Sequence, residues 1–168
     1  MISSLYSHCS LRTDKKQAIE RANMNNCKIS LVKQISEATE AKMSQGIQEH
    51  ALSNGVNIDW NPFSLELFNE KNETIGVLEA FSSYSSIYIN ELWVDKDYRG
   101  KGYGTQLIAE LERLYKNKGF NNINTVSCAF QAPEFYKKCG FKAEFVRENI
   151  QNPKLSLTFF VKFFKDEN

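Results

Sequence analysis

A glycine-rich stretch, Arg99-Gly100-Lys101-Gly102-Tyr103-Gly104-Thr105, has residue types and a spacing that suit the binding of an anion. It follows an apolar run at residues 87–94 and precedes a helical pattern at residues 105–116. Glycine adopts positive φ at no steric cost, so successive backbone N–H groups can turn toward one point. A helix dipole behind these groups and the charges of Arg99 and Lys101 beside them predict an anion site.

The glycine spacing excludes two common nucleotide-binding loops. The P-loop needs a Lys-Ser/Thr pair directly after its last glycine, whereas Thr105 follows Gly104 with no lysine between them. The dinucleotide pattern G-x-G-x-x-G is also absent, because Gly100, Gly102 and Gly104 recur at every second residue. A plain glycine-rich turn between a strand and a helix is the alternative that the glycines alone leave open.

Two motifs, in the right order and at the right separation, resemble those of the GNAT acyltransferase superfamily. Arg99, Gly102 and Gly104 fit its Arg/Gln-x-x-Gly-x-Gly/Ala loop, and residues 91–95 before that loop resemble its central strand. Residues 132–141, Ala-Pro-Glu-Phe-Tyr-Lys-Lys-Cys-Gly-Phe, resemble its second motif. The resemblance covers the chain from roughly Cys27 onward and implies an N-acetyltransferase that uses acetyl-CoA.

The resemblance also implies a role for each motif in acyl transfer. The loop N–H groups would hold the pyrophosphate of coenzyme A, and the backbone of the preceding strand would pair with the pantetheine amides. The N–H of Val94 would then face the thioester oxygen, and Tyr136 would return a proton to the departing thiolate as general acid. The residues implied in donor binding are Leu92, Val94, Arg99, Gly100, Lys101, Gly102, Tyr103, Gly104 and Thr105.

Three glutamates on predicted strands are candidates for the general base: Glu66, Glu79 and Glu91. Glu91 is nearest in sequence to the implied oxyanion donor and is assigned as the base, acting directly or through a water molecule. At the position where some family members carry a base, this chain has Tyr88. Each glutamate has an alternative role on a solvated strand face, or, with Asp59, in an acidic entrance for a cationic amine.

The composition argues against several other functions. The 168 residues are 42% hydrophobic and 24% charged, with a net charge of +1, which favours neither nucleic acid nor an acidic membrane surface. No apolar run has the length of a membrane span, and the first residues lack a secretory pattern, so we expect a cytoplasmic protein. The four cysteines and two histidines lack metal-ligand spacing, so we expect no metal. Cys139 is interpreted as a packing residue rather than a nucleophile.

The order of predicted elements favours an α+β fold. We expect an N-terminal extension at residues 1–26, with a helical pattern at 13–24, and a GNAT-like acyltransferase domain at 27–168. The fold implied is a mixed, mostly antiparallel sheet of about six or seven strands flanked by helices. The strands are predicted at residues 28–35, 64–70, 74–84, 87–94, 123–130, 142–150 and 155–164, and the helices at 37–53, 105–116 and from Pro133 to Gly140, with an irregular segment at 56–63.

Alternation in the last predicted strand places Leu155, Leu157, Phe159, Val161 and Phe163 on one face, which we expect to meet the core. Phe160 and Phe164 are then left on the other face as an apolar patch, which favours a homodimer. The acceptor is expected to be a small-molecule or peptide amine. A non-catalytic acyl-CoA-binding or interaction module with the same fold is the alternative function.

Overall fold

The computed structural model describes residues 27–164. The chain divides into two units, Met1–Glu40 and Ala41–Asn168, and their boundary falls inside the first helix. The helical pattern predicted at residues 13–24 lies outside the described residues. In chain order the elements are α1 Glu37–Ser53, β1 Trp60–Phe68, β2 Thr74–Ser83, β3 Ser86–Val94, η2 Lys96–Tyr98, α2 Tyr103–Tyr115, β4 Asn122–Cys128, α3 Pro133–Lys138, β5 Lys142–Arg147, η3 Pro153–Leu155 and β6 Leu157–Phe163.

The segment before α1 differs from its prediction, whereas α1 itself matches. Residues 28–35 form no strand, although their apolar residues alternate, because no other described strand pairs with them. An extended segment without a partner cannot satisfy its backbone groups within a sheet. In α1, the Ser36 Oγ accepts a hydrogen bond from the Thr39 N–H at 3.2 Å, which is the N-cap expected of serine. The helix is followed by Gly55 at φ 73°.

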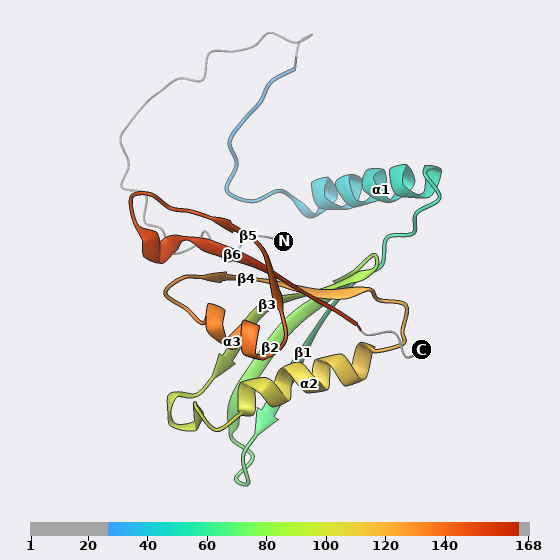
Figure 1. Cartoon of the computed structure of the whole chain (residues 1–168). Coiled ribbons are helices and arrows are strands. Elements are labelled where there is room, and N and C mark those ends of the chain that lie inside the picture. The colour runs from blue at the N-terminus through green and yellow to red at the C-terminus, as the bar shows by residue number, and fades with distance from the viewer. Residues whose placement is uncertain (1–26, 165–168) are drawn as a thin grey trace. The chain divides into compact units, whose positions relative to one another are not determined.

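The first three strands form an antiparallel meander (Figure 1). β1 begins at Trp60, so residues 60–63, which were predicted to be irregular, belong to a strand. The predicted turn between β1 and β2 is confirmed. The Asn69 Oδ1 accepts from the N–H groups of Lys71 at 2.9 Å and Glu73 at 3.0 Å, and thereby fixes the turn.

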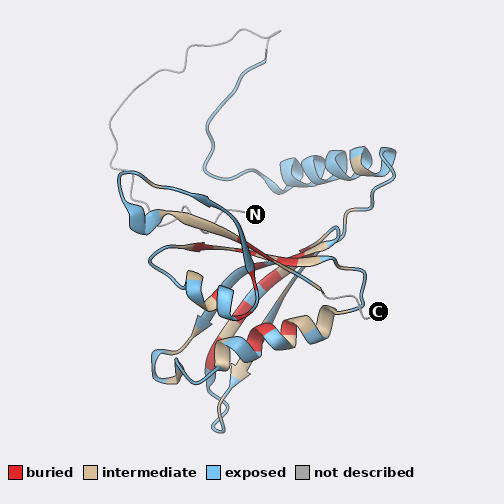
Figure 2. Ribbon diagram, viewed as in Figure 1, coloured by how far each residue is buried: buried red, intermediate tan, exposed pale blue. Residues whose placement is uncertain are grey.

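Six strands in the order β1-β2-β3-β4-β6-β5 make one sheet. Only β3 and β4 run parallel, and the other neighbours are antiparallel. The expected α+β class and mostly antiparallel sheet are therefore confirmed. The helices α2 and α3 supply buried residues to one common core, and Figure 2 shows the buried residues gathered where these helices face the sheet.

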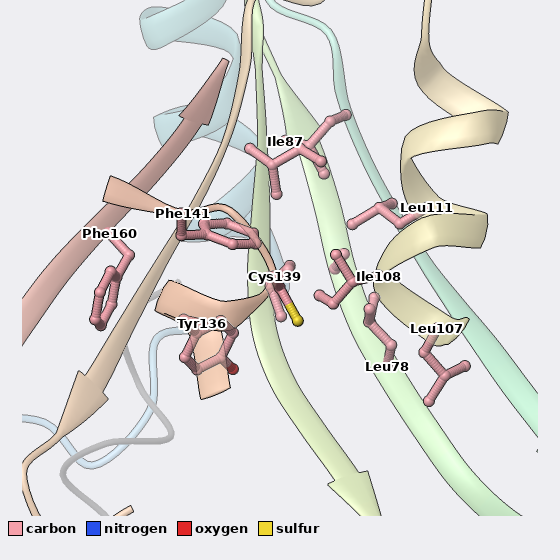
Figure 3. Packing of buried hydrophobic residues seen from close by; sticks show 12 residues of the cluster. Leu78, Ile87, Leu107, Ile108, Leu111, Tyr136, Cys139, Phe141 and Phe160 are labelled. Carbon is pink, nitrogen blue, oxygen red and sulfur yellow. The ribbon is translucent and has the colours of Figure 1, made fainter. Parts of the chain in front are cut away.

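The core-facing stripe of α2 consists of Leu107, Ile108 and Leu111, all with less than a twentieth of their surface exposed. These side chains pack on Leu78 and Ile87 of the central strands (Figure 3). Burial of such a stripe supplies most of the stability of a helix of this length.

The prediction for the two faces of β6 was only partly right, because Val161 is 5% exposed as expected but the most buried residue of the strand lies on the other face. Phe160 is 1% exposed and packs on the Tyr136 ring with centroids 5.6 Å apart, while Phe163, assigned to the core, is 60% exposed. Phe164 packs against the core cluster as well. Each face of β6 carries a buried residue, Val161 on one and Phe160 on the other, so alternation alone does not show which face meets the helices. The phenylalanine patch from which a homodimer was expected is therefore absent.

A β-bulge in β3 changes which side chains face the core. Glu79 and Ala80 of β2 are opposite Glu91 and Ile89, so Asn90 is an extra residue in β3. Before the bulge the odd-numbered Ile87 and Ile89 are buried, and after it Leu92 and Val94 pack on the core. The bulge lies on the strand that leads to the glycine loop, and such bulges are frequent next to active sites.

Candidate active site

The glycine loop is fixed by hydrogen bonds to its own backbone. The Arg99 Nε donates to the carbonyl oxygen of Val94 at 2.8 Å, and the Lys101 Nζ donates to that of Asp97 at 3.0 Å. The Asp95 carboxylate accepts from the N–H of Asp97 at 2.9 Å and caps the 3-10 turn η2. Both cations therefore lie along the loop, which raises the local positive potential beside the N-terminus of α2.

The three loop glycines have two different functions in the structure. Gly100 and Gly102 have φ 76° and 86°, and a Cβ at either would meet no atom within 4 Å. These residues give the chain the left-handed turns that bring it to the first residue of α2. Gly104 lies inside the helix, and a Cβ there would be 3.1 Å from the ring of Phe135. It is therefore needed for the close approach of α2 to α3.

The first turn of α2 presents backbone N–H groups at this loop. The helix begins at Tyr103, with Gly102 as an N-cap that makes no side-chain cap. The first four N–H groups of a helix have no partner within the helix, and they attract anions. The structure thus brings the residues assigned to pyrophosphate binding, Gly100 to Thr105, to one place.

The parallel pairing of β3 and β4 covers only the three residue pairs from Ser86 to Tyr88. Beyond these pairs β3 remains paired with β2 alone. The Asp95 N–H donates to the Ile75 oxygen of β2 at 2.9 Å. Because backbone groups alternate between the two sides of a strand, those of Val94 and Leu92 point to the other side, where β4 has separated. This arrangement supports the assignment of the Leu92 backbone and the Val94 N–H to the donor, while the Val94 carbonyl oxygen accepts from Arg99.

Tyr136 is 8% exposed and lies among aromatic rings of the core, as Figure 3 shows. The Thr125 hydroxyl on β4 lies beside that of Tyr136 and donates to the Ile89 oxygen at 3.4 Å. Burial raises the pKa of Tyr136 above its ordinary value, the neighbouring Thr125 hydroxyl opposes this rise, and the negative charge of Glu91 adds to it. Tyr136 is therefore a protonated phenol at neutral pH and lies within electrostatic range of Glu91.

The acidic residues of the predicted entrance are only partly brought together. Glu79 and Glu91 are direct neighbours across β2 and β3, and both are exposed. Glu66 is opposite Val77, and its carboxylate accepts from the Thr74 hydroxyl at 3.2 Å. Asp59 precedes β1 at the far end of the hairpin. The candidate site therefore has a pair of carboxylates rather than a ring of four.

Two residues of the site were missed by the sequence analysis: Thr125 and Phe135. Thr125 is a buried polar residue of β4 on the same face as the buried Ile123 and Ser127, and polar residues at core positions of a strand were a detectable signal. Phe135 showed no signal, because its contact with Gly104 joins two separate helices. Cys139 is buried with its Sγ 3.8 Å from the Thr105 Oγ1, and burial raises the pKa of its thiol, as a packing role requires.

No group of three or more potential metal-ligating side chains occurs among residues 27–164. Within the same residues, no helix combines the length and apolar character needed to cross a membrane.

Comparison with known proteins gives three informative similarities. The model of the Acetyltransferase (GNAT) family matches residues 32–141. The blasticidin-S acetyltransferase of Streptomyces morookaense is 34% identical over 74 residues, or 44% of this chain, and the chain spans about half (54%) of that relative. A crystal structure of an acetyltransferase from Bacillus cereus is 30% identical, with a TM-score of 0.65 over 80% of this chain and 97% of the other.

A fourth similarity concerns the fold alone. An aminoglycoside 6'-N-acetyltransferase complexed with coenzyme A is 17% identical, with a TM-score of 0.56 over 64% of this chain and 75% of the other.

Proposed function

The chain belongs to the GNAT acetyltransferase family, and from this premise we propose that it transfers the acetyl group of acetyl-CoA to a primary amine. The observation that carries the proposal is the separation of β3 from β4 beside the glycine loop. This separation leaves the backbone of Leu92 and Val94 next to a loop of N–H groups, with the Tyr136 helix on the same face of the sheet. A thioester with a pyrophosphate tail fits such an arrangement.

In the proposed reaction the amine nitrogen attacks the thioester carbonyl carbon. A C–N bond forms, the carbonyl oxygen becomes negative, and the N–H of Val94 stabilises it. When the C–S bond breaks, the thiolate takes a proton from Tyr136, and the positively charged nitrogen of the intermediate loses its second proton to solvent, so that the products are a neutral amide and a free thiol. The free thiol has a reference pKa of about 8.5 and tyrosine one of about 10, so Tyr136 can be reprotonated from solvent before the next turnover.

Glu91 is proposed to accept the proton that the ammonium must lose before attack, directly or through a water molecule. It is exposed, it lies on β3 three residues before Val94, and its charge reaches Tyr136. The acid and the base of the proposed reaction would then lie on opposite sides of the reacting carbonyl, as a direct attack requires.

The acceptor is proposed to be a small molecule or peptide with a primary amine. One protein named above is a blasticidin-S acetyltransferase and another an aminoglycoside 6'-N-acetyltransferase, which makes blasticidin S and aminoglycosides the first compounds to test. A cytoplasmic location stays a prediction. A homodimer also stays a prediction, although the apolar patch from which it was expected is absent.

The test has two stages. Calorimetry should show that the protein binds acetyl-CoA below millimolar concentration. Gly119→Ala alters a positive-φ glycine far from the loop, so it should bind acetyl-CoA as the wild type does and serves as the control for variants of the loop glycines. Release of free CoA should then depend on an added amine from a panel of antibiotics, polyamines and peptide N-termini. Binding without amine-dependent release across the panel would favour the non-catalytic alternative, and absence of binding would contradict both functions.

A further inference from the structure

The sheet face opposite α2 and α3 carries a row of aromatic side chains across three strands. The row consists of Trp60 on β1, Phe81 on β2 and Tyr88 on β3. The ring centroids of Trp60 and Phe81 are 6.2 Å apart, and those of Phe81 and Tyr88 are 5.1 Å apart with planes only 12° from parallel. Trp60 is 44% exposed and Tyr88 is 39% exposed. Exposed aromatic surface that is continuous over neighbouring strands is typical of a binding surface.

The glutamate pair, Glu79 and Glu91, lies on the same face and directly beside this row. Glu79 is two residues before Phe81 on β2, a distance of about 7 Å along a strand. Two like charges directly opposite each other on neighbouring strands destabilise a sheet. The two carboxylates concentrate negative charge at this place on the sheet, which attracts a positively charged ligand.

The proposed reaction places the acceptor amine at this position. Glu91 is the proposed base, and its charge acts on the Tyr136 hydroxyl. An amine arriving as an ammonium ion would meet the glutamate pair first and would lie within reach of the reacting carbonyl. The rest of the acceptor would then extend along β2 and β3 over the aromatic row.

We infer that the acceptor is a cationic amine that carries a planar ring about two strand residues, or about 7 Å, from its nitrogen. The inference rests on the proposed function and names the class of amine that the site selects. The glutamate pair recognises the ammonium group, and the rings of Phe81 and Tyr88 pack against the planar ring. A flexible aliphatic polyamine would use the carboxylates but leave the aromatic row without a partner.

The experiment uses a matched series of synthetic amines with acetyl-CoA and the full-length protein. Phenylalkylamines with one to four methylene groups between ring and nitrogen are each compared with the cyclohexylalkylamine of the same spacer length, whose ring is saturated, and with n-hexylamine, which has no ring. We expect one spacer length to give a kcat/KM about five- to tenfold above that of its saturated analogue, the usual size of an aromatic contact. Calorimetry without acetyl-CoA should rank the same amines by affinity.

Variants identify the residues responsible. Phe81→Leu and, independently, Tyr88→Leu should abolish the preference for the planar ring while leaving acetyl-CoA affinity unchanged. Phe68→Leu changes an exposed aromatic residue at the other end of β1 and should retain the preference. Glu79→Gln should raise KM for every cationic amine and make KM less sensitive to salt concentration. Glu70→Gln, in the hairpin turn, should change neither KM nor its sensitivity to salt.

The outcomes separate the two levels of the proposal. Acetyl transfer to ringless and ring-bearing amines with equal kcat/KM, or equal effects of Phe81→Leu and Phe68→Leu, would overturn the inference and leave the acetyltransferase intact. A protein that neither binds acetyl-CoA nor acetylates any amine would overturn the proposed function, and the inference with it. Urea midpoints of the variants close to that of the wild type exclude unfolding as the cause of a lost preference.

Discussion

Gly104 and Phe135 are in contact across two helices, and a methyl group at Gly104 would lie 3.1 Å from two carbons of the Phe135 ring. Gly104 belongs to the first turn of α2, and Phe135 precedes Tyr136 on α3. This contact therefore joins the glycine loop to the helix that carries the proposed acid, Tyr136. A change in either helix is transmitted to the other through packing, because protein interiors have little free volume.

Substitution of the two glycines should separate their functions. Gly104→Ala should lower kcat more than donor affinity, because the Phe135 ring must move and take the neighbouring Tyr136 with it. Gly102→Ala should weaken acetyl-CoA binding first, since alanine at φ 86° costs about 1–2 kcal/mol and the loop must rearrange. Calorimetry and single-turnover rates measure the two effects. Gly119→Ala, at φ 84° and equally open, should cost stability without changing either; equal losses of donor affinity in Gly102→Ala and Gly119→Ala would contradict the assignment.

Tyr136→Phe tests the proposed general acid. Removal of the hydroxyl should lower turnover by roughly 10²–10⁴-fold, the size of a positioned proton transfer, while acetyl-CoA affinity stays the same. Tyr115→Phe removes a half-buried hydroxyl from α2 away from the site and serves as the matched control. Wild-type turnover in Tyr136→Phe, with chemistry rate-limiting, would remove this residue from the mechanism.

The raised pKa of Tyr136 predicts a dependence of stability on pH. The folded protein favours the neutral phenol, so Tyr136 contributes fully below the unfolded-state value of about 10 and loses its contribution as pH rises beyond that value. Urea unfolding between pH 8 and pH 11 should therefore show a steeper alkaline loss in the wild type than in Tyr136→Phe. Tyr136→Phe leaves every other ionisable group in place, so the effects of those groups cancel in the difference. Parallel curves would show that the phenol is not shielded from water.

Lys162 should stabilise the contact between β6 and the two helices. Its Nζ donates to the Cys139 carbonyl oxygen at 2.6 Å and pairs with the Glu112 carboxylate of α2, and the side chain is 24% exposed. Lys162→Met should lower the free energy of unfolding by about 1–3 kcal/mol, because a half-buried carboxylate and a helix-terminal carbonyl lose their donor. Lys137→Met breaks the exposed pair with Glu134 and should change stability by at most about 0.5 kcal/mol in the same urea experiment.

The sequence predicted the local elements well and their contacts across the sheet less well. Gly140 at φ 86° and Pro133 at the first position of α3 were foreseeable, since each residue type acts on its own backbone. The burial of Phe160 was not, because its face of β6 also carries Thr158 and Lys162 and meets the core only through the packing of α3. The partnership of Thr125 with Tyr136 joins two elements and has no local pattern either.

The short register between β3 and β4 divides the sheet into two antiparallel halves of three strands. Three residue pairs join the halves, against nine between β1 and β2 and seven between β4 and β6. Regions with few backbone hydrogen bonds open most readily, so the two halves can act as separate cooperative units that exchange their amide hydrogens at different rates. The proposed donor site lies along their junction. A bound donor would join the two halves. Donor binding would therefore stabilise the sheet against opening at this junction, and opening of the junction would weaken donor binding.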